Sequence, residues 1–134
     1  MPIKWKDKAW DQFSRYIRMR DCLETTGTIT EGRCVTCGRL YSYKKLQAGH
    51  CVPGRGNAIL LHEQAVHAQC RGCNVFQGGR HSDYALIIID RYGRDVLETL
   101  QRLSKTAKNM KAWEWEIEFY KYKDKADALE KENQ

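Results

Sequence analysis

The chain has 134 residues and a mass of 15.7 kDa, which is the size of one domain and argues against two independent hydrophobic cores. Its longest apolar run, residues 84–89, is far shorter than the ~20 residues that cross a bilayer, and its first residues lack the apolar core of a signal peptide. We therefore expect a soluble protein that lies in the cytoplasm and does not contact a membrane.

The charge is unevenly distributed along the chain. The formal net charge is +6, and residues 1–82 carry 13 Lys and Arg against six Asp and Glu. Residues 83–134 carry 10 basic and 11 acidic side chains, so the whole surplus lies in the first part. A basic surface favours an anionic partner such as a nucleic acid, although the same excess also serves solubility.

The N-terminal segment is predicted to form a basic amphipathic helix. Trp10, Phe13 and Ile17 recur with helical spacing within residues 4–24, and arginines flank them. The following region, residues 32–62, is rich in β-forming residues and glycine, which predicts short strands. We expect strands at 39–43, 46–52 and 58–62, with a hairpin turn at 52–57.

The second half of the chain is predicted to be helical. A short helix over residues 73–77 is ended by Gly78 and Gly79. Capping residues and apolar periodicity predict two further helices, over residues 82–92 and 95–105. With the preceding strands, these elements predict an α+β fold.

The last segment has an ambiguous pattern. Residues 113–122 alternate as in a strand, whereas Trp113, Ile117 and Tyr120 have helical spacing, and the Glu, Lys and Ala content of the tail favours the helix. This aromatic segment is expected either to close the core or to form a dimer surface. Residues 130–134 are expected to be disordered.

Four of the six cysteines form two Cys-x-x-Cys pairs, Cys34 with Cys37 and Cys70 with Cys73. A two-residue gap lets both thiolates of a pair bind one ion, so two pairs predict a structural zinc site with four sulfur ligands. The 32 residues between the pairs exceed the ~15–20 of a simple zinc ribbon, which indicates an inserted segment.

Other roles for these cysteines fit less well. A disulfide framework is disfavoured in a reducing compartment, and a redox pair lacks the surrounding βαβ pattern. Four ordinary buried cysteines remain an alternative, but the spacing occurs twice. Cys22 and Cys51 are expected to be buried without a ligand role.

Two residues near the cysteine pairs suit phosphodiester hydrolysis. His50 lies between the pairs, and Asn74 directly follows Cys73. A hairpin that offers a histidine, followed by a helix that offers an amide oxygen, is the ββα-metal arrangement of nucleases. His50 could then deprotonate water, and Asn74 could bind Mg²⁺ or Mn²⁺. The structural alternatives are a hydrogen-bonded histidine and a helix-capping asparagine.

Five segments carry a family resemblance: residues 8–21, Cys34-Val35-Thr36-Cys37, Gln47-Ala48-Gly49-His50, residues 66–74 and residues 88–93. With these segments, about residues 8–104 resemble the NinG (Rap) family of phage recombination proteins. The resemblance implies a single HNH-type (His-Me finger) endonuclease domain related in its site to endonuclease VII, with His50 as general base and Asn74 as catalytic metal ligand. It also implies branched DNA substrates such as Holliday junctions and D-loops, and the host cytoplasm as the location.

Within this single domain we expect three parts. Residues 1–31 would form the basic N-terminal helix, residues 32–81 the zinc-bound ββα-metal core, and residues 82–134 the helical C-terminal part.

Two positions depart from the HNH pattern. Gly49 stands where many HNH enzymes carry an acidic metal ligand, and Ala65 stands where the middle asparagine is expected. Additional contacts to the metal or the phosphate are therefore expected from His62, Glu63 or His67. For His67, packing against the cysteine pair is the alternative.

Arginines near the predicted site and on the first helix are candidates for DNA contacts, because guanidinium groups bind phosphate oxygens in a bidentate way. Symmetric cleavage of a four-way junction needs two sites, so we expect a homodimer. The candidate arginines are Arg15, Arg18, Arg20, Arg55, Arg71 and Arg80.

Two other functions fit the same pattern. One is a non-catalytic zinc-knuckle protein that binds DNA, in which His50 and Asn74 are structural. The other is an HNH nickase without junction preference, since selectivity for branches depends on surface shape rather than on side chains that contact bases.

Overall fold

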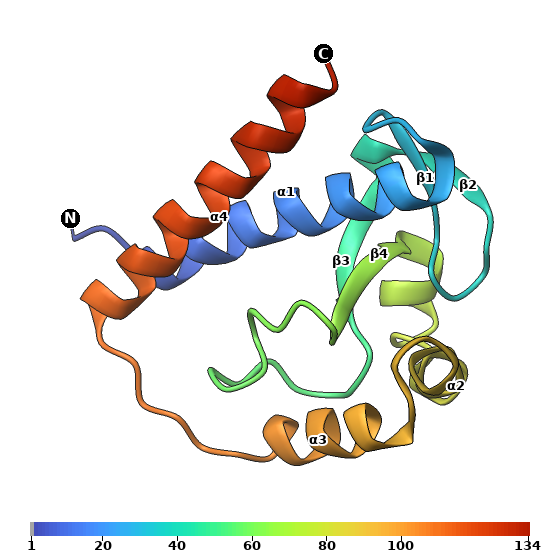
Figure 1. Ribbon diagram of the computed structural model, residues 1–134. Coiled ribbons are helices and arrows are strands. Elements are labelled where there is room, and N and C mark those ends of the chain that lie inside the picture. Colours follow the sequence, from blue (N-terminus) through green and yellow to red (C-terminus); the bar gives the residue numbers. More distant parts are fainter. Residues whose placement is uncertain (1) are drawn as a thin grey trace.

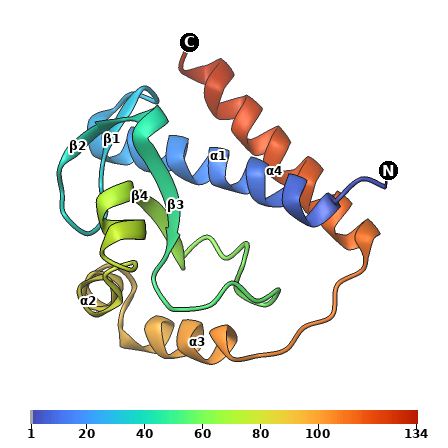
Figure 2. The same ribbon diagram turned by 180° about the vertical axis from the view of Figure 1, so that it is seen from behind.

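Two long helices from opposite ends of the chain lie against each other in the computed structural model, which describes residues 2–134. They are α1 (Trp5–Thr26) and α4 (Ala112–Glu132), and Figures 1 and 2 show them side by side. Two small antiparallel sheets and two shorter helices complete the domain. The predicted α+β class is confirmed at this level.

The contact between α1 and α4 is aromatic. Phe13 and Ile17 of α1 are fully buried, and the Phe13 ring meets the Tyr122 ring of α4 edge-on, with centroids 4.8 Å apart. Edge-to-face contacts of this kind add to the burial of apolar area. The apolar stripe predicted for the first helix is therefore the face that packs.

The last segment is helical throughout, which settles the ambiguity of residues 113–122. Trp115 and Tyr122 face the core, whereas Trp113, Ile117 and Tyr120 are exposed. The helix continues through Glu132, so the disorder expected for residues 130–134 is wrong for residues 130–132. Ion pairs from Arg15 of α1 to Asp127 and Glu130 hold this end of α4.

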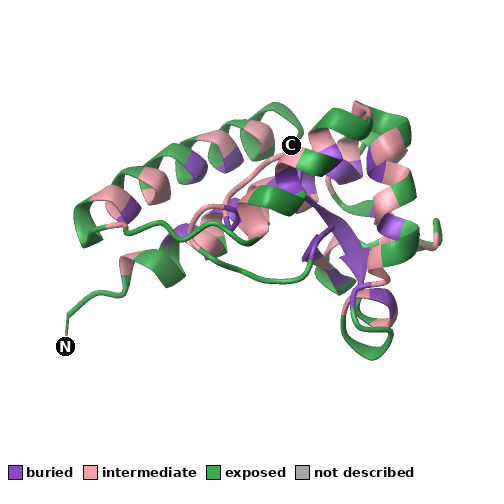
Figure 3. Cartoon of the chain, turned by 90° about the horizontal axis from the view of Figure 1, so that it is seen from below, coloured by how far each residue is buried: buried purple, intermediate pink, exposed green. Residues whose placement is uncertain are grey.

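The central hairpin pairs β3 (Leu46–His50) with β4 (Val66–Cys70), and Gly49 lies opposite His67. The partner strand predicted at 58–62 is wrong, because residues 57–61 form turns, and the predicted hairpin turn at 52–57 is only the start of a longer connection. All five residues of β4 are buried, as Figure 3 shows in purple. The β4 sequence, Val-His-Ala-Gln-Cys, alternates apolar and polar side chains over five residues, and its polar His67 and Gln69 are buried along with the apolar ones.

A second, smaller sheet pairs β1 (Glu31–Arg33) with β2 (Leu40–Ser42). The β2 strand lies within the expected 39–43, but β1 was not predicted. A single turn of 3-10 helix, η1 (Tyr43–Lys45), then leads into β3. This sheet carries the first cysteine pair in its turn.

The remaining helical segments agree with the sequence pattern to within a residue or two. They are η2 (Gly72–Phe76), a short π-type helix, then α2 (His81–Tyr92) and α3 (Arg94–Ser104). Gly93, with φ of 94°, separates α2 from α3 because it permits a conformation that side chains disfavour. None of the helices in residues 2–134 has the length and apolar character needed to cross a membrane.

The close approach of β1 to α1 predicts a stability effect at Gly32. A Cβ there would lie 2.7 Å from Cys22 Sγ and 2.9 Å from the Cys22 Cα, so Gly32→Ala forces a backbone shift. We expect a loss of about 1–3 kcal/mol in the free energy of unfolding, measured by chemical denaturation. Gly56→Ala, whose Cβ would meet nothing within 4 Å, is the control and should change stability little. Equal stability of the two variants would contradict the packing described.

Candidate functional site

Four cysteines from two parts of the chain form one cluster. Cys34 and Cys37 lie in the turn between β1 and β2, Cys70 ends β4, and Cys73 lies in η2. All four sulfur atoms lie within 4.8 Å of one another, and Cys37 Sγ is 3.9 Å from Cys70 Sγ. A tetrahedral zinc ion with ~2.3 Å bonds places its sulfurs about 3.8 Å apart. The donor set therefore fits zinc, as the sequence predicts.

Backbone N–H groups stabilise the thiolates of this cluster. The Cys37 N–H donates to Cys34 Sγ at 3.5 Å, and the Cys73 N–H donates to Cys70 Sγ at 3.4 Å. Burial alone would raise the pKa of the Cys34 thiol, but N–H groups of Cys37 and Cys70 outweigh it and lower that pKa to about 6. Cys34 thus favours the ionised form that binds metal, whereas burial raises the pKa of the Cys37 thiol to about 12.

His50, at the end of β3, is held from two sides. Its ring stacks on Trp10 of α1, with centroids 5.5 Å apart and planes 16° apart. Its Nε2 lies 3.1 Å from the Leu60 carbonyl oxygen, which can only accept, so Nε2 carries the proton and Nδ1 keeps its lone pair. Burial lowers the pKa of His50 to about 4, so the ring is neutral at pH 7.

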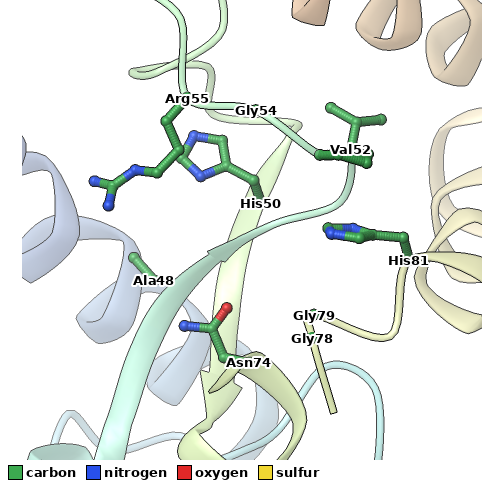
Figure 4. Close-up of a pocket in the computed structure, with 10 residues that line it drawn as sticks. Ala48, His50, Val52, Gly54, Arg55, Asn74, Gly78, Gly79 and His81 are labelled. Carbon is green, nitrogen blue, oxygen red and sulfur yellow. The ribbon is translucent and has the colours of Figure 1, made fainter. Parts of the chain in front are cut away.

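Asn74 faces the same pocket as His50 (Figure 4). Its Nδ2 donates to Gln47 Oε1 at 2.8 Å, which fixes the amide and leaves Oδ1 as the free acceptor. The pocket has a volume of about 170 Å³, and Gly78 and Gly79 line it without side chains. The structure therefore brings together the two residues that the sequence predicts as base and metal ligand.

The packing around Gly49 explains why no acidic residue precedes His50. A Cβ at this position would lie 2.1 Å from Gln69 Oε1 and 2.9 Å from Asn74 Oδ1. An aspartate here would displace both amide groups. The lack of a side chain at Gly49 is thus a steric requirement of this packing, because two amide oxygens converge on the space beside it.

Gln69 of β4 is a buried residue that connects the turn of the first cysteine pair with the pocket. It is fully buried, and its Nε2 donates to the Gly79 carbonyl at 2.9 Å and to Thr36 Oγ1 at 3.1 Å. Its Oε1 has no hydrogen-bond partner within the described residues. Sequence reasoning missed Gln69, since only the β3–β4 register, which pairs it with Gln47, brings it here.

Three residues expected to make additional contacts do not line this pocket: His62, Glu63 and His67. Glu63 instead binds Lys125 Nζ and the Tyr122 hydroxyl, each at 3.0 Å. His67 is buried, and its Nε2 lies 2.9 Å from the Tyr92 hydroxyl. Burial, and then the charges of Arg20 and Arg91, lower the pKa of His67 to about 3.

His67 nevertheless supports the site indirectly. Its Nδ1 lies 3.3 Å from the Tyr84 hydroxyl, which donates to the Gly49 carbonyl at 2.8 Å. The backbone next to His50 is therefore fixed by a buried network. His67 therefore has a packing role, but it packs on Tyr84 and Tyr92 of α2 and not, as the alternative for it expected, on the cysteine pair.

Of the six candidate arginines, Arg55 lines the pocket, with its guanidinium 4.4 Å from the Trp10 ring centroid. Arg15 binds acidic groups of α4, and Arg20 binds Asp21 and the carbonyls of Glu63 and Val66, so both are engaged within the protein. The other three contact neighbouring groups as follows: Arg18 the Tyr43 ring, Arg71 the Phe76 ring, and Arg80 Asp83 and Cys73 Sγ.

The C-terminal aromatic segment serves the monomer core on one face and is open on the other. Trp115 and Tyr122 are buried, whereas Trp113, Ile117 and Tyr120 are 60%, 57% and 50% exposed. Closure of the core is thus one role of this segment. The homodimer stays a prediction.

Comparison with known proteins gives one match. The family model described as "Bacteriophage Lambda NinG protein" matches residues 2–132, which is nearly the whole chain. No curated protein and no solved structure shows a match.

The sulfur cluster predicts one zinc ion per chain and a fold that depends on it. Cys37→Ala should abolish stoichiometric zinc, measured by atomic absorption, and lower the melting temperature, because binding of structural zinc contributes directly to folding. Cys22→Ala, which removes a thiol outside the cluster, should keep one zinc per chain. A chelator should lower the melting temperature of the wild type and leave Cys37→Ala unchanged. Full zinc content in Cys37→Ala would disprove the four-sulfur site.

Proposed function

Since the chain belongs to the NinG family, we propose that it is a metal-dependent DNA endonuclease that hydrolyses phosphodiester bonds in branched recombination intermediates. The observation that carries this proposal is the shared pocket of His50 and Asn74. Within the described residues, neither His50 Nδ1 nor Asn74 Oδ1 has a hydrogen-bond partner. A lone pair for a proton and an oxygen for a cation therefore face one space that is open to solvent.

The order of elements supports an HNH, or His-Me finger, relationship. Two antiparallel strands, β3 and β4, are followed at once by the helical segment η2. His50 ends the first strand, and Asn74 lies in the helical segment directly after a zinc-binding cysteine. This order supports a ββα arrangement, in which a structural metal would hold the catalytic residues in place.

His50 acts as the general base in this mechanism. Its neutral Nδ1 takes a proton from a water molecule, whose oxygen forms a bond to the scissile phosphorus. The bond from phosphorus to the 3′ oxygen breaks on the opposite side, and that oxygen takes a proton from solvent. The products carry 5′-phosphate and 3′-hydroxyl ends. The Leu60 carbonyl and the Trp10 ring keep the imidazole oriented throughout.

Asn74 would hold the cation through Oδ1, and the hydrogen bond of its Nδ2 to Gln47 keeps that oxygen directed into the pocket. A bound Mg²⁺ or Mn²⁺ would neutralise negative charge on the phosphate and on the leaving oxygen. Arg55 lies at the rim, where its planar guanidinium, stacked on Trp10, suits a DNA phosphate. The surplus of basic residues in the first 82 positions supports the same polyanionic substrate.

A non-catalytic DNA-binding protein is the second candidate. The burial of His50, which is only 8% exposed, together with its stacking and hydrogen bond, is also what a structural histidine shows. In that case the zinc cluster alone would organise a basic surface. Substitutions of His50 and Asn74 distinguish the endonuclease from the non-catalytic DNA-binding protein.

We expect His50→Ala and Asn74→Ala to lose DNA cleavage in Mg²⁺ or Mn²⁺ while they retain zinc and DNA binding. Loss of a general base lowers a rate by about 10²–10⁴-fold. Asn109→Ala, an asparagine in the exposed connection before α4, is the matched control for Asn74 and should cleave normally. Cleavage of four-way junction, flap and linear duplex DNA is compared for each protein.

The substrate comparison separates the alternatives. Faster cleavage of the junction than of the duplex supports branch selectivity, and equal rates indicate a nickase without it. If the wild type binds DNA but cuts none of the three, it is a binding protein. Undiminished cleavage by His50→Ala would rule out the mechanism.

The lowered pKa of His50 predicts an unusual pH profile. A base with a pKa of about 4 is still ~97% neutral at pH 5.5, whereas an imidazole of ordinary pKa 6.5 is only ~10% neutral there. Since kcat/KM reflects ionisation of the free enzyme, it should change less than about twofold from pH 7.5 to pH 5.5. It should fall only as the pH approaches 4. A roughly tenfold drop by pH 5.5 at constant zinc content would contradict the burial of His50.

A further inference from the structure

Another polar side chain, besides His50, Asn74 and Arg55, lines the pocket and has no role in the mechanism above. His81 is the first residue of α2, and its ring lines the pocket together with His50 and Asn74. Figure 4 shows the ring directed from the start of α2 toward the space between those two residues. The sequence gives no motif around His81, so only the folded chain reveals this position.

One hydrogen bond decides which nitrogen of His81 is available. Nδ1 lies 3.2 Å from the Cys51 carbonyl oxygen, which can only accept a proton. In the neutral ring, the proton is therefore on Nδ1, and Nε2 keeps a lone pair. Histidines that bind metals typically donate their other ring N–H to a carbonyl or a carboxylate in this way.

The ring of His81 is also fixed by its neighbours. A Cβ at Gly79 would lie 2.8 Å from both Nε2 and Cε1 of His81, so the ring packs where a side chain at Gly79 would be. The Gly79 carbonyl is in turn held by Gln69. Arg80 has a left-handed backbone, with φ of 50°, and its guanidinium contacts Asp83 and Cys73 Sγ. The zinc cluster thus helps to set the direction of His81.

We propose that His81 Nε2 and Asn74 Oδ1 are two protein ligands of the divalent cation. The inference rests on the proposed endonuclease function and completes its metal site. Contact with a phosphate oxygen fits less well, because a lone pair on Nε2 cannot donate to an oxygen that also only accepts. His81 supplies the second ligand that the acidic residue provides in other HNH sites, since Gly49 leaves no room for it.

The pocket has room for such an ion with its water. Its volume of about 170 Å³ corresponds to roughly five waters at ~30 Å³ each. Hydrated cations bound by one or two protein groups keep several waters. A nitrogen ligand also favours a transition-metal ion such as Mn²⁺ over Mg²⁺, which prefers oxygen.

The test measures Mn²⁺ binding directly, with zinc-loaded protein and no DNA. Free Mn²⁺ is followed by electron paramagnetic resonance during titration of the wild type and of His81→Phe, which keeps an aromatic ring but removes both nitrogens. We expect His81→Phe to bind Mn²⁺ at least about tenfold more weakly. His62→Phe, a matched substitution of a ring that does not line the pocket, should bind as the wild type does. Zinc content confirms that each variant is folded.

The outcomes separate this inference from the endonuclease proposal. If His81→Phe binds Mn²⁺ like the wild type while Asn74→Ala does not, His81 is not a ligand and the endonuclease proposal stands. If the wild type cleaves DNA but binds no Mn²⁺ without it, the His81 assignment is also overturned. If the wild type neither binds Mn²⁺ nor cleaves DNA, both proposals fail. An equal loss of affinity in His62→Phe would likewise overturn the assignment.

Discussion

The convergence of four cysteine sulfurs is the constraint on which the candidate site depends. Two sulfurs come from the turn of the small sheet and two from the end of β4 and from η2, so one cluster joins segments 32 residues apart. Asn74 directly follows Cys73, and Arg80 contacts its sulfur just before His81. The position of each proposed metal ligand therefore depends on the cysteine cluster, and a zinc ion bound there would support the pocket as well as the fold.

A second connection between the cysteine cluster and the pocket is made by the buried side-chain amide of Gln69. Gln69 connects the Gly79 carbonyl to the zinc-binding turn at Thr36, while its unpaired Oε1 lies beside Gly49. A buried acceptor without a partner costs about 1–3 kcal/mol, so its orientation needs a reason. The two hydrogen bonds that Gln69 Nε2 donates fix this orientation, because a flipped amide would place Oε1 against the Gly79 carbonyl oxygen. The pocket is thus rigid on the side that faces Asn74.

The helical layer acts on the site through aromatic contacts. Trp10 of α1 stacks on His50 and also carries the guanidinium of Arg55, while other residues of α1 pack on α4. The long helices therefore shield His50 from water and keep it neutral, since burial is the largest cause of its lowered pKa. His67 is neutral for the same reason and fixes the backbone beside His50 through Tyr84.

The sequence by itself determined the features that depend on local spacing: the two cysteine pairs, the helices, and the proximity of Asn74 to Cys73. Tertiary structure alone decided the rest. It decided which segment pairs with β3. Residues 66–70 alternate apolar and polar side chains over only five positions, whereas Ile59 and Leu60, in the segment predicted as the partner strand, are buried in a turn. Gln69 reaches the site through the β3–β4 register, and His81 reaches it through the turn at residues 78–80 that precedes α2. Both depend on contacts between residues distant in sequence, which leave no local signal.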